Sequence, residues 1–345
     1  MWNLPAFALR LISWCYRVVV AYRRRFPPQQ VRVEVPVISV GNVTVGGTGK
    51  TPIVGMLAGR LLRDGLRVGI VSAGYGRAEH RTILEPGYRI QKLSAETVGD
   101  EVRLLAEKLP EAIFCVDKSK AHAARMLAAD KRVDVIIVDD GFQHRKLARD
   151  IDIVTYDASL KPKLLKMFPY GLLREPLSAL DRADVVIVTR ARFATDISET
   201  LRALRRYNDV ASFYTAQFVP SDIVNENGRL PVKYLKDKSA FLFAGVGNFE
   251  SLRRQVAALV GDLDGWLELS DHQRYNPALL RRIRHLAEKH NSDLLLTTAK
   301  DWVKLGHFDF GREIYYVDIT VDLDPGEEKL TDRIRQRLNL ARRQP

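Results

Sequence analysis

The chain has 345 residues, of which 46% are hydrophobic and 28% charged, so it is long enough for two domains with separate cores. Its 54 Lys and Arg exceed its 42 Asp and Glu, which admits nucleic acid, anionic lipid or phosphorylated ligands as partners. The only two cysteines, Cys15 and Cys115, exclude a disulfide framework and indicate a reducing cytoplasm.

The N-terminal segment, residues 1–28, predicts an amphipathic helix at a membrane surface. Residues 2–22 are mostly apolar, but Arg10, Arg17 and Arg24 recur every seven residues and form one polar stripe on a helix. These interruptions argue against a membrane-spanning helix, and a signal peptide would begin with a basic stretch. We expect an interfacial helix with its arginines facing anionic lipid. The alternative is a helix packed on the protein itself, with its polar stripe in solvent.

From Val35 onward, apolar runs alternate with helical patterns, which predicts an α/β fold with a mostly parallel sheet and helices on both faces. Strands are expected near 36–40, 67–72, 112–116, 133–138, 151–155 and 184–189, and helices near 52–63, 100–109, 119–129 and 195–206.

The pattern loosens at 219–238, where prolines, an Asn-Gly pair and clustered charges predict a linker between a domain at 29–218 and a smaller α/β domain at 239–345. In the second domain we expect strands at 240–244, 264–269, 293–297 and 313–319, and helices at 248–259, 277–289 and 326–343.

After the first expected strand comes the pattern of a P-loop, which would bind a nucleoside triphosphate and Mg²⁺. The glycines let backbone amides converge on phosphate oxygens at a helix N-terminus. Lys50 would reach the β- and γ-phosphates, and the Thr51 hydroxyl would bind Mg²⁺. Thr44 replaces the usual first glycine. The nucleotide-binding candidates are Thr44, Val45, Gly46, Gly47, Thr48, Gly49, Lys50 and Thr51.

A second acidic element supports this prediction. The apolar run 133–138 ends in Asp139 and Asp140, where a Walker B carboxylate acting on Mg²⁺ is expected, although two acids could merely begin a turn. The Asn-Lys-x-Asp element of signalling GTPases is missing from any suitable strand end. A membrane-associated P-loop switch ATPase acting on a protein partner remains the alternative to a kinase. Nucleic-acid binding lacks a recognisable reading module.

Several separate stretches together resemble the tetraacyldisaccharide 4′-kinase (lipid A 4′-kinase) family over nearly the whole chain. They are SVGNVTVGGTGKTP at 39–52, GYGR at 74–77, VGDE at 98–101, VDDGFQHR at 138–145, GLLREPLSAL at 171–180, FAGVGN at 243–248, SDHQRY at 270–275 and TTAKDWVKL at 297–305.

The resemblance implies transfer of the γ-phosphate of ATP to the 4′-hydroxyl of an acylated glucosamine disaccharide 1-phosphate, forming lipid IVA. The expected location is the cytoplasmic face of the bacterial inner membrane, with no nucleic acid and no obligate protein partner. By resemblance, Asp100 acts on the acceptor hydroxyl and His272 supports it, and the second domain brings His272 across an interdomain cleft. Glu101 could join the metal ligands or be an ordinary first-turn acid. Cleft-lining candidates are Tyr75, Gln143, His144, Arg174 and Glu175.

Two lysine groups depart from the family pattern or extend it. Lys118 and Lys120 stand where the family often has arginines, so point-charge contacts would replace bidentate contacts to phosphate. Lys161, Lys163 and Lys166 lie among apolar residues and could meet the lipid's phosphate and acyl chains. Their alternative is an amphipathic surface helix.

Overall fold

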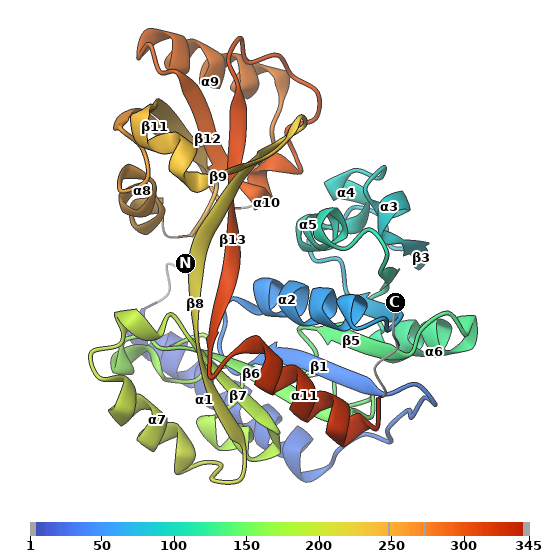
Figure 1. Ribbon diagram of the computed structural model, residues 1–345. Helices are drawn as coiled ribbons and strands as arrows, with labels where there is room; N and C mark the ends of the chain where they lie inside the picture. Colours follow the sequence, from blue (N-terminus) through green and yellow to red (C-terminus); the bar gives the residue numbers. More distant parts are fainter. Residues whose placement is uncertain (1–4, 248, 272, 341–345) are drawn as a thin grey trace.

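The computed structural model describes residues 5–247, 249–271 and 273–340 (Figure 1). Within these residues, thirteen strands form one sheet in the order β11-β10-β12-β13-β8-β7-β6-β1-β5-β2-β4-β3, with β9 paired to β8. The strands are β1 Val37–Asn42, β2 Val68–Ser72, β3 Ile83–Pro86, β4 Ile113–Val116, β5 Val135–Asp139, β6 Ile151–Asp157, β7 Val185–Thr189, β8 Ser212–Asn225, β9 Gly228–Pro231, β10 Ser239–Ala244, β11 Asp262–Glu268, β12 Leu294–Thr298 and β13 Ile314–Asp324. Most neighbouring pairs are parallel, which confirms the expected α/β class.

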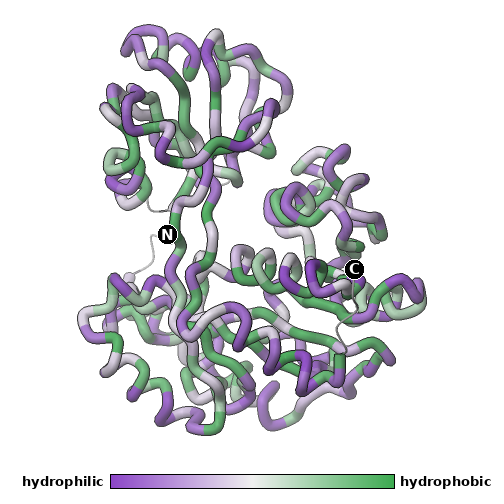
Figure 2. Tube along the Cα trace, in the orientation of Figure 1, coloured by the Kyte–Doolittle hydropathy of each residue, from purple (hydrophilic) through white to green (hydrophobic). Residues whose placement is uncertain are grey.

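Helices connect these strands. They are α1 Ala6–Arg25, α2 Lys50–Arg63, α3 Gly87–Ile90, α4 Ala95–Val98, α5 Asp100–Lys108, α6 Lys120–Asp130, α7 Ile197–Arg205, α8 Phe249–Ala257, α9 Pro277–Lys289, α10 Ala299–Trp302 and α11 Glu327–Leu338, with 3₁₀ turns η1 Pro162–Leu164, η2 Leu177–Arg182, η3 Ala191–Phe193 and η4 Val232–Asp237. Figure 2 shows that the central strands are largely hydrophobic, whereas the outer helices carry many hydrophilic residues.

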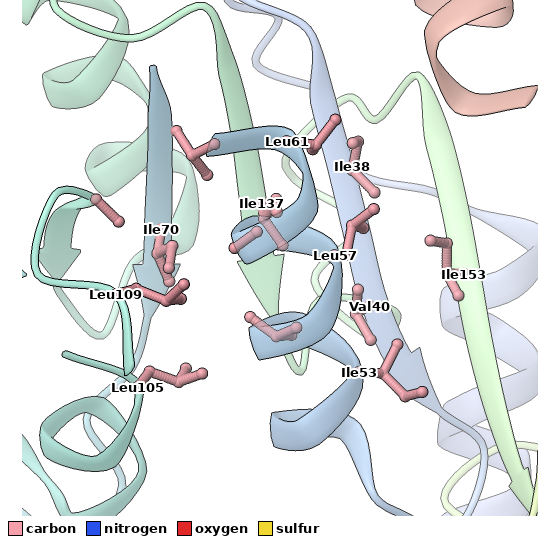
Figure 3. Close-up of a cluster of buried hydrophobic side chains, with 14 of the residues drawn as sticks. Ile38, Val40, Ile53, Leu57, Leu61, Ile70, Leu105, Leu109, Ile137 and Ile153 are labelled. Atoms are coloured by element: carbon pink, nitrogen blue, oxygen red, sulfur yellow. The ribbon is translucent and has the colours of Figure 1, made fainter. Parts of the chain in front are cut away.

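The centre of the sheet is buried on both faces because its strands are nearly continuous runs of Val and Ile. Side chains alternate between the faces: Ile38 and Val40 pack beneath α2, whereas Val37 packs in the cluster on the opposite face. Figure 3 shows Leu57 and Leu61 of α2 lying over the first of these faces. Each such side chain stabilises the fold by about 1.5–3 kcal/mol, so α2 and β1 hold the loop between them rigidly.

The upper lobe consists of β10, β11, β12 and α8 to α10, and it is joined to the lower body by the long strands β8 and β13 (Figure 1). These two strands pair antiparallel from Tyr316↔Val224 to Asp324↔Thr215. The segment 219–238, expected as a linker, contains the second half of β8, then β9 and η4, and its place as a boundary between domains stays a prediction. The prolines of this segment lie in strands and its Asn-Gly pair lies in a hairpin turn. The same residue types are typical of linkers, so composition alone does not distinguish the two structures.

The last helix returns to the lower body. Leu330 and Ile334 of α11 belong to the same buried cluster as α2, and Glu328 pairs with Arg60 at 3.3 Å. Residues 239–345 thus do not all pack in the upper lobe, since α11 covers α2. The division of the chain into separate domains stays an interpretation.

Helix α1 docks on the lower body through the face that carries Ser13, Tyr16 and Arg24. The Ser13 hydroxyl donates to the Met167 carbonyl at 2.8 Å, Arg10 donates to the Tyr170 hydroxyl at 3.0 Å, and Arg24 pairs with Asp181 at 3.1 Å. Packing of α1 on the protein itself is thus confirmed, and Arg24 is engaged there, whereas Arg10 and Arg17 remain exposed. Contact of these arginines with anionic lipid stays a prediction. The outward face is apolar, with exposed Phe7, Leu11, Trp14, Val18 and Tyr22.

Candidate active site

The segment Thr44–Thr51 forms a tight loop between β1 and α2, as its sequence predicts. Gly46 and Gly49 have φ values of +109° and +82°, which L-residues rarely adopt. A Cβ built on Gly46 or Gly47 would meet no atom within 4 Å, so that side of the loop is open. Lys50 and Thr51 begin α2, whose first-turn amides and dipole favour a bound anion.

Thr48 anchors this loop to the sheet. Its side chain is buried, its hydroxyl accepts from Asn42 Nδ2 at 3.0 Å, and it lies 2.7 Å from the Thr155 hydroxyl. The Thr189 hydroxyl donates to the Thr48 carbonyl at 3.0 Å. Because the side chain points into the protein, Thr48 has only its backbone to offer a nucleotide.

The start of the loop is fixed from a different segment. The Val45 amide donates to the Leu172 carbonyl at 2.6 Å, and Thr44 forms a bridge with Leu173. Thr44 is buried, so the residue that replaces the usual glycine lies inside the structure. The GLLREP segment therefore supports the loop.

The two Walker B candidates end β5 beside the loop and differ in their surroundings. Lys50 Nζ lies 3.4 Å from Asp140 Oδ1, and Arg174 donates to Asp140 Oδ2 at 2.9 Å. Burial would raise the pKa of Asp140, but the charges of Lys50 and Arg174 outweigh it and lower this pKa to about 2. Asp140 is thus held as an anion that orients both cations.

Asp139 is buried more deeply. Burial, followed by the negative charge of Glu101, raises the pKa of the Asp139 carboxyl to about 7. Within the described residues, its Oδ1 atom has no hydrogen-bond partner. Two carboxylates in this arrangement favour a bound cation, although no group of three His, Cys, Asp or Glu with metal-binding geometry occurs in the described part of the chain.

Lys120 braces the end of β5 from α6. Its Nζ donates to the carbonyls of Asp139 and Asp140 at 2.5 and 2.6 Å, and burial lowers its pKa. The Lys120 ammonium is thus directed at the backbone, whereas Lys118 is exposed, and a phosphate contact from either lysine stays a prediction. Although part of His144 is exposed, desolvation and then repulsion by Lys120 lower its pKa to about 4, so the imidazole is neutral.

Asp100 begins α5 on a rigid support. Gly99, the preceding residue, has a φ of +95°, and a Cβ there would lie 3.0 Å from Gly74. The VGDE and GYGR segments therefore pack directly together, with Tyr75 at the exposed tip of the second. His272, the predicted partner of Asp100, lies outside the described residues.

A residue that the sequence did not single out reaches Asp100 from the upper lobe. Lys304 Nζ lies 3.6 Å from Asp100 Oδ2 and 3.1 Å from Asp301 Oδ1. Lys304 belongs to the TTAKDWVKL segment, but one lysine in a turn after a short helix carries no signal of this contact.

Gln143 and Glu175 brace the site from inside the protein. Gln143 donates to the Asn42 carbonyl at 2.8 Å and to Glu175 at 3.2 Å. Arg182 holds the buried Glu175 carboxylate with two hydrogen bonds of 3.0 and 3.1 Å. Glu175 thus has both carboxylate oxygens engaged with the protein, whereas Gln143 engages its amide nitrogen and its buried Oε1 has no hydrogen-bond partner in the described part of the chain.

A glycine-rich loop at the carboxyl end of a central parallel strand, with a lysine facing a strand-end carboxylate, defines a P-loop nucleotide-binding protein. The chain matches the family tetraacyldisaccharide-1-P 4′-kinase over residues 5–339, and it belongs to that family.

Individual relatives agree over most of their length. The tetraacyldisaccharide 4′-kinase of Halothermothrix orenii is 32% identical, covering 93% of this chain and 88% of that protein. The one from Chlorobium phaeovibrioides is 36% identical, covering 87% of each. Among solved structures, the "apo" form of LpxK from Aquifex aeolicus in complex with ATP has a TM-score of 0.78 at 29% identity, covering 96% of this chain and 99% of that one.

Proposed function

We propose that the protein transfers the γ-phosphate of ATP to the 4′-hydroxyl of a tetraacylated glucosamine disaccharide 1-phosphate, using Asp100 as the base. Tetraacyldisaccharide 4′-kinase activity in lipid A biosynthesis follows from family membership. The assignment of roles rests on one observation: the phosphate loop, the end of β5 and the start of α5 meet. Lys50 lies 3.4 Å from Asp140, and Glu101 is close enough to raise the pKa of Asp139.

The triphosphate would lie on the open side of the loop, over Gly46 and Gly47, with its oxygens toward the first-turn amides of α2. Lys50 and Arg174 would neutralise charge on the transferred group, since Asp140 holds both cations in place. The ATP-bound LpxK of Aquifex aeolicus supports ATP as the nucleotide.

The residues at the end of β5 fit Mg²⁺. The orphaned oxygen of buried Asp139, the Asp140 carboxylate and the Thr51 hydroxyl supply oxygen ligands, and Glu101 is a further candidate. Mg²⁺ in nucleotide sites is commonly held by one or two carboxylates together with phosphate oxygens, so a cluster of three acids is not required. The ion would neutralise negative charge on the phosphates.

In the transfer step, the 4′-oxygen forms a bond to the γ-phosphorus while the bond from that phosphorus to the β–γ bridging oxygen breaks. The hydroxyl proton passes to the Asp100 carboxylate, and ADP leaves with the bridging electrons. His272 as the partner that supports Asp100 stays a prediction.

The lipid substrate would be reached at an anionic membrane surface through α1. Its outward apolar face includes Phe7, with 77% of its surface exposed, and Trp14, with 64% exposed. Lys161, Lys163 and Lys166 are exposed, and η1 occurs where an amphipathic helix was their alternative. Lys166 stacks on Tyr170, whose hydroxyl also accepts from Arg10 of α1. Such a face, flanked by cations, suits partial burial among lipid headgroups. Within the described residues, no helix has both the length and the apolarity needed to cross a bilayer.

A membrane-binding test uses the exposed apolar face. Leu11→Glu with Val18→Glu should reduce co-sedimentation with anionic liposomes, because both side chains are exposed and apolar. Val210→Glu is the matched control, because Val210 is also apolar and 84% exposed but lies in the turn between α7 and β8, outside α1. Equal binding by the double variant and the control would refute the membrane role of α1.

The activity is tested with γ-labelled ATP and a tetraacyl disaccharide 1-phosphate. We expect label in the lipid, whereas label released only as free phosphate would favour the switch ATPase. Asp100→Asn should cut transfer by about 10²-fold or more with nucleotide affinity retained, because it removes the base alone. Lys50→Ala should weaken nucleotide handling itself. Transfer by Asp100→Asn at the wild-type rate would contradict the assigned role.

A further inference from the structure

Lys304 is held in the upper lobe by a fixed carboxylate. Asp301 is fully buried, and its Oδ2 accepts from the Gly245 amide at 3.0 Å and from the Thr298 hydroxyl at 2.7 Å. Its other oxygen, Oδ1, lies 3.1 Å from Lys304 Nζ. The ammonium is therefore ion-paired with a buried carboxylate that two further donors hold in place, although Nζ and Oδ1 form no hydrogen bond in the described part of the chain.

The same ammonium reaches across to the lower body. Lys304 Nζ lies 3.6 Å from Asp100 Oδ2, and both side chains are mostly buried, at 10% and 17% exposed. The two residues come from different parts of the fold, since Asp100 begins α5 and Lys304 follows α10. Screening by solvent is weak for such a pair, so the attraction orients the carboxylate more strongly than a surface ion pair would.

We propose that Lys304 is a positioning residue for phosphoryl transfer, which anchors on Asp301 and fixes the Asp100 carboxylate across the junction between the lobes. This inference rests on the proposed role of Asp100 as the base. A general base must lie within hydrogen-bond reach of the proton it takes, so a carboxylate free to change rotamer would spend less time in productive geometry. Lys304 acts through Asp100 and makes no contact with the reacting atoms.

A purely mechanical role is the competing explanation, and the chain offers a matched control for it. Lys108, at the other end of α5, pairs with buried Asp318 of β13 at 2.5 Å. Both ion pairs therefore tie α5 to another element, β13 through Lys108 and the segment after α10 through Lys304, but only Lys304 contacts Asp100. Asp318 also accepts from Arg229 at 2.8 Å, so Lys108→Met leaves that carboxylate paired.

The test compares kcat and KM in Lys304→Met, Lys304→Arg and Lys108→Met. Lys304→Met keeps the length of the side chain without its charge and should lower kcat by about 10²-fold, the size of effect expected from a small misplacement, with KM for both substrates changed less than about threefold. Lys304→Arg should recover most of kcat, and Lys108→Met should stay near wild type. If Lys304→Met does not fold, as judged by its thermal transition, Lys304→Gln replaces it.

The double variant Asp100→Asn with Lys304→Met separates this inference from the proposed function. If Lys304 acts through Asp100, adding Lys304→Met to Asp100→Asn should lower kcat by less than about twofold. The inference would be overturned if Lys304→Met lowered kcat equally in the wild-type and Asp100→Asn backgrounds. It would also be overturned if Lys304→Met raised KM for the lipid with kcat unchanged, or if Lys304→Met and Lys108→Met lowered kcat equally. Wild-type transfer by Asp100→Asn would instead refute the role of the base.

Discussion

Gly49→Ala is expected to destabilise the protein for two separable reasons. Gly49 has a φ of +82°, where an L-residue costs about 1–2 kcal/mol. Its added Cβ would also lie 2.0 Å from Cζ and 2.6 Å from Cε2 of Phe218, a residue of β8. Overpacking of this kind typically costs about 1–3 kcal/mol. The two contributions together predict a loss of about 2–5 kcal/mol in the free energy of unfolding.

Phe218→Leu separates the contributions, because leucine lacks the Cε and Cζ atoms that the new methyl would meet. In that background, Gly49→Ala should cost only the backbone contribution, about 1–2 kcal/mol. Gly47→Ala is the matched control in the same loop: its φ is not positive and its Cβ would meet nothing within 4 Å, so its cost should be about 0.5 kcal/mol or less.

Urea denaturation of the four variants and the wild type, without nucleotide, measures these differences. The coupling between Gly49→Ala and Phe218→Leu should be about 1–3 kcal/mol. A cost of Gly49→Ala that is the same in both backgrounds, or no greater than that of Gly47→Ala, would refute the reasoning. It would mean that β8 does not restrain the phosphate loop.

Three further substitutions test the buried polar groups of the site. The pKa of Asp139 is about 7 in the folded protein, whereas an unfolded aspartate has a pKa of roughly 3.9. As pH rises from about 3.9 to about 7, this carboxyl ionises in the unfolded chain before it does so in the folded one, and the free energy of unfolding falls. Asp139→Asn should therefore gain stability relative to wild type from pH 5 to pH 7 in urea denaturation without metal, and a constant difference would contradict this. Thr48→Val removes the partner of Asn42 and should cost about 1–3 kcal/mol and raise KM for ATP; an unchanged KM would show that the anchor does not serve nucleotide binding. Arg182→Met leaves the buried Glu175 carboxylate without its cation and should cost about 3–5 kcal/mol in thermal or urea denaturation, whereas lost kcat with full stability would point to a direct role.

Most of the lower body could be predicted from the sequence because its signals are local. Strands of continuous Val and Ile are buried on both faces, so β1, β2, β5 and β7 appear as short apolar runs bounded by polar residues. The loop glycines and the acids that end β5 lie next to such runs. Their positions relative to the sheet therefore follow from the chain order alone.

The side-chain roles could not be predicted in the same way, since they depend on contacts between distant segments. Lys120 is directed to the carbonyls that end β5, and Arg10 is directed to Tyr170, although in sequence both look like cations for an external anion. Ser13 and Arg24 of α1 face the protein because their partners at 167–181 supply a carbonyl, a hydroxyl and a carboxylate. Periodicity reveals that a helix has two faces, but only the partner surface decides which face is buried.

Helix α5 is held at both ends, and the two ends should respond differently to substitution. At its N-terminus, Lys304 holds Asp100, while at its C-terminus Lys108 holds Asp318 of β13. A nine-residue helix is about 13 Å long, so a local rotamer change at Lys108 is not transmitted to Asp100 while α5 stays folded and packed. The C-terminal contact should therefore influence stability, and the N-terminal contact the rate of transfer. Since β13 also pairs with β8, whose Phe218 packs on Gly49, the strands that join the lobes contact the loop and the helix that carry the site. A displacement of the upper lobe would then disturb the phosphate loop and the base together.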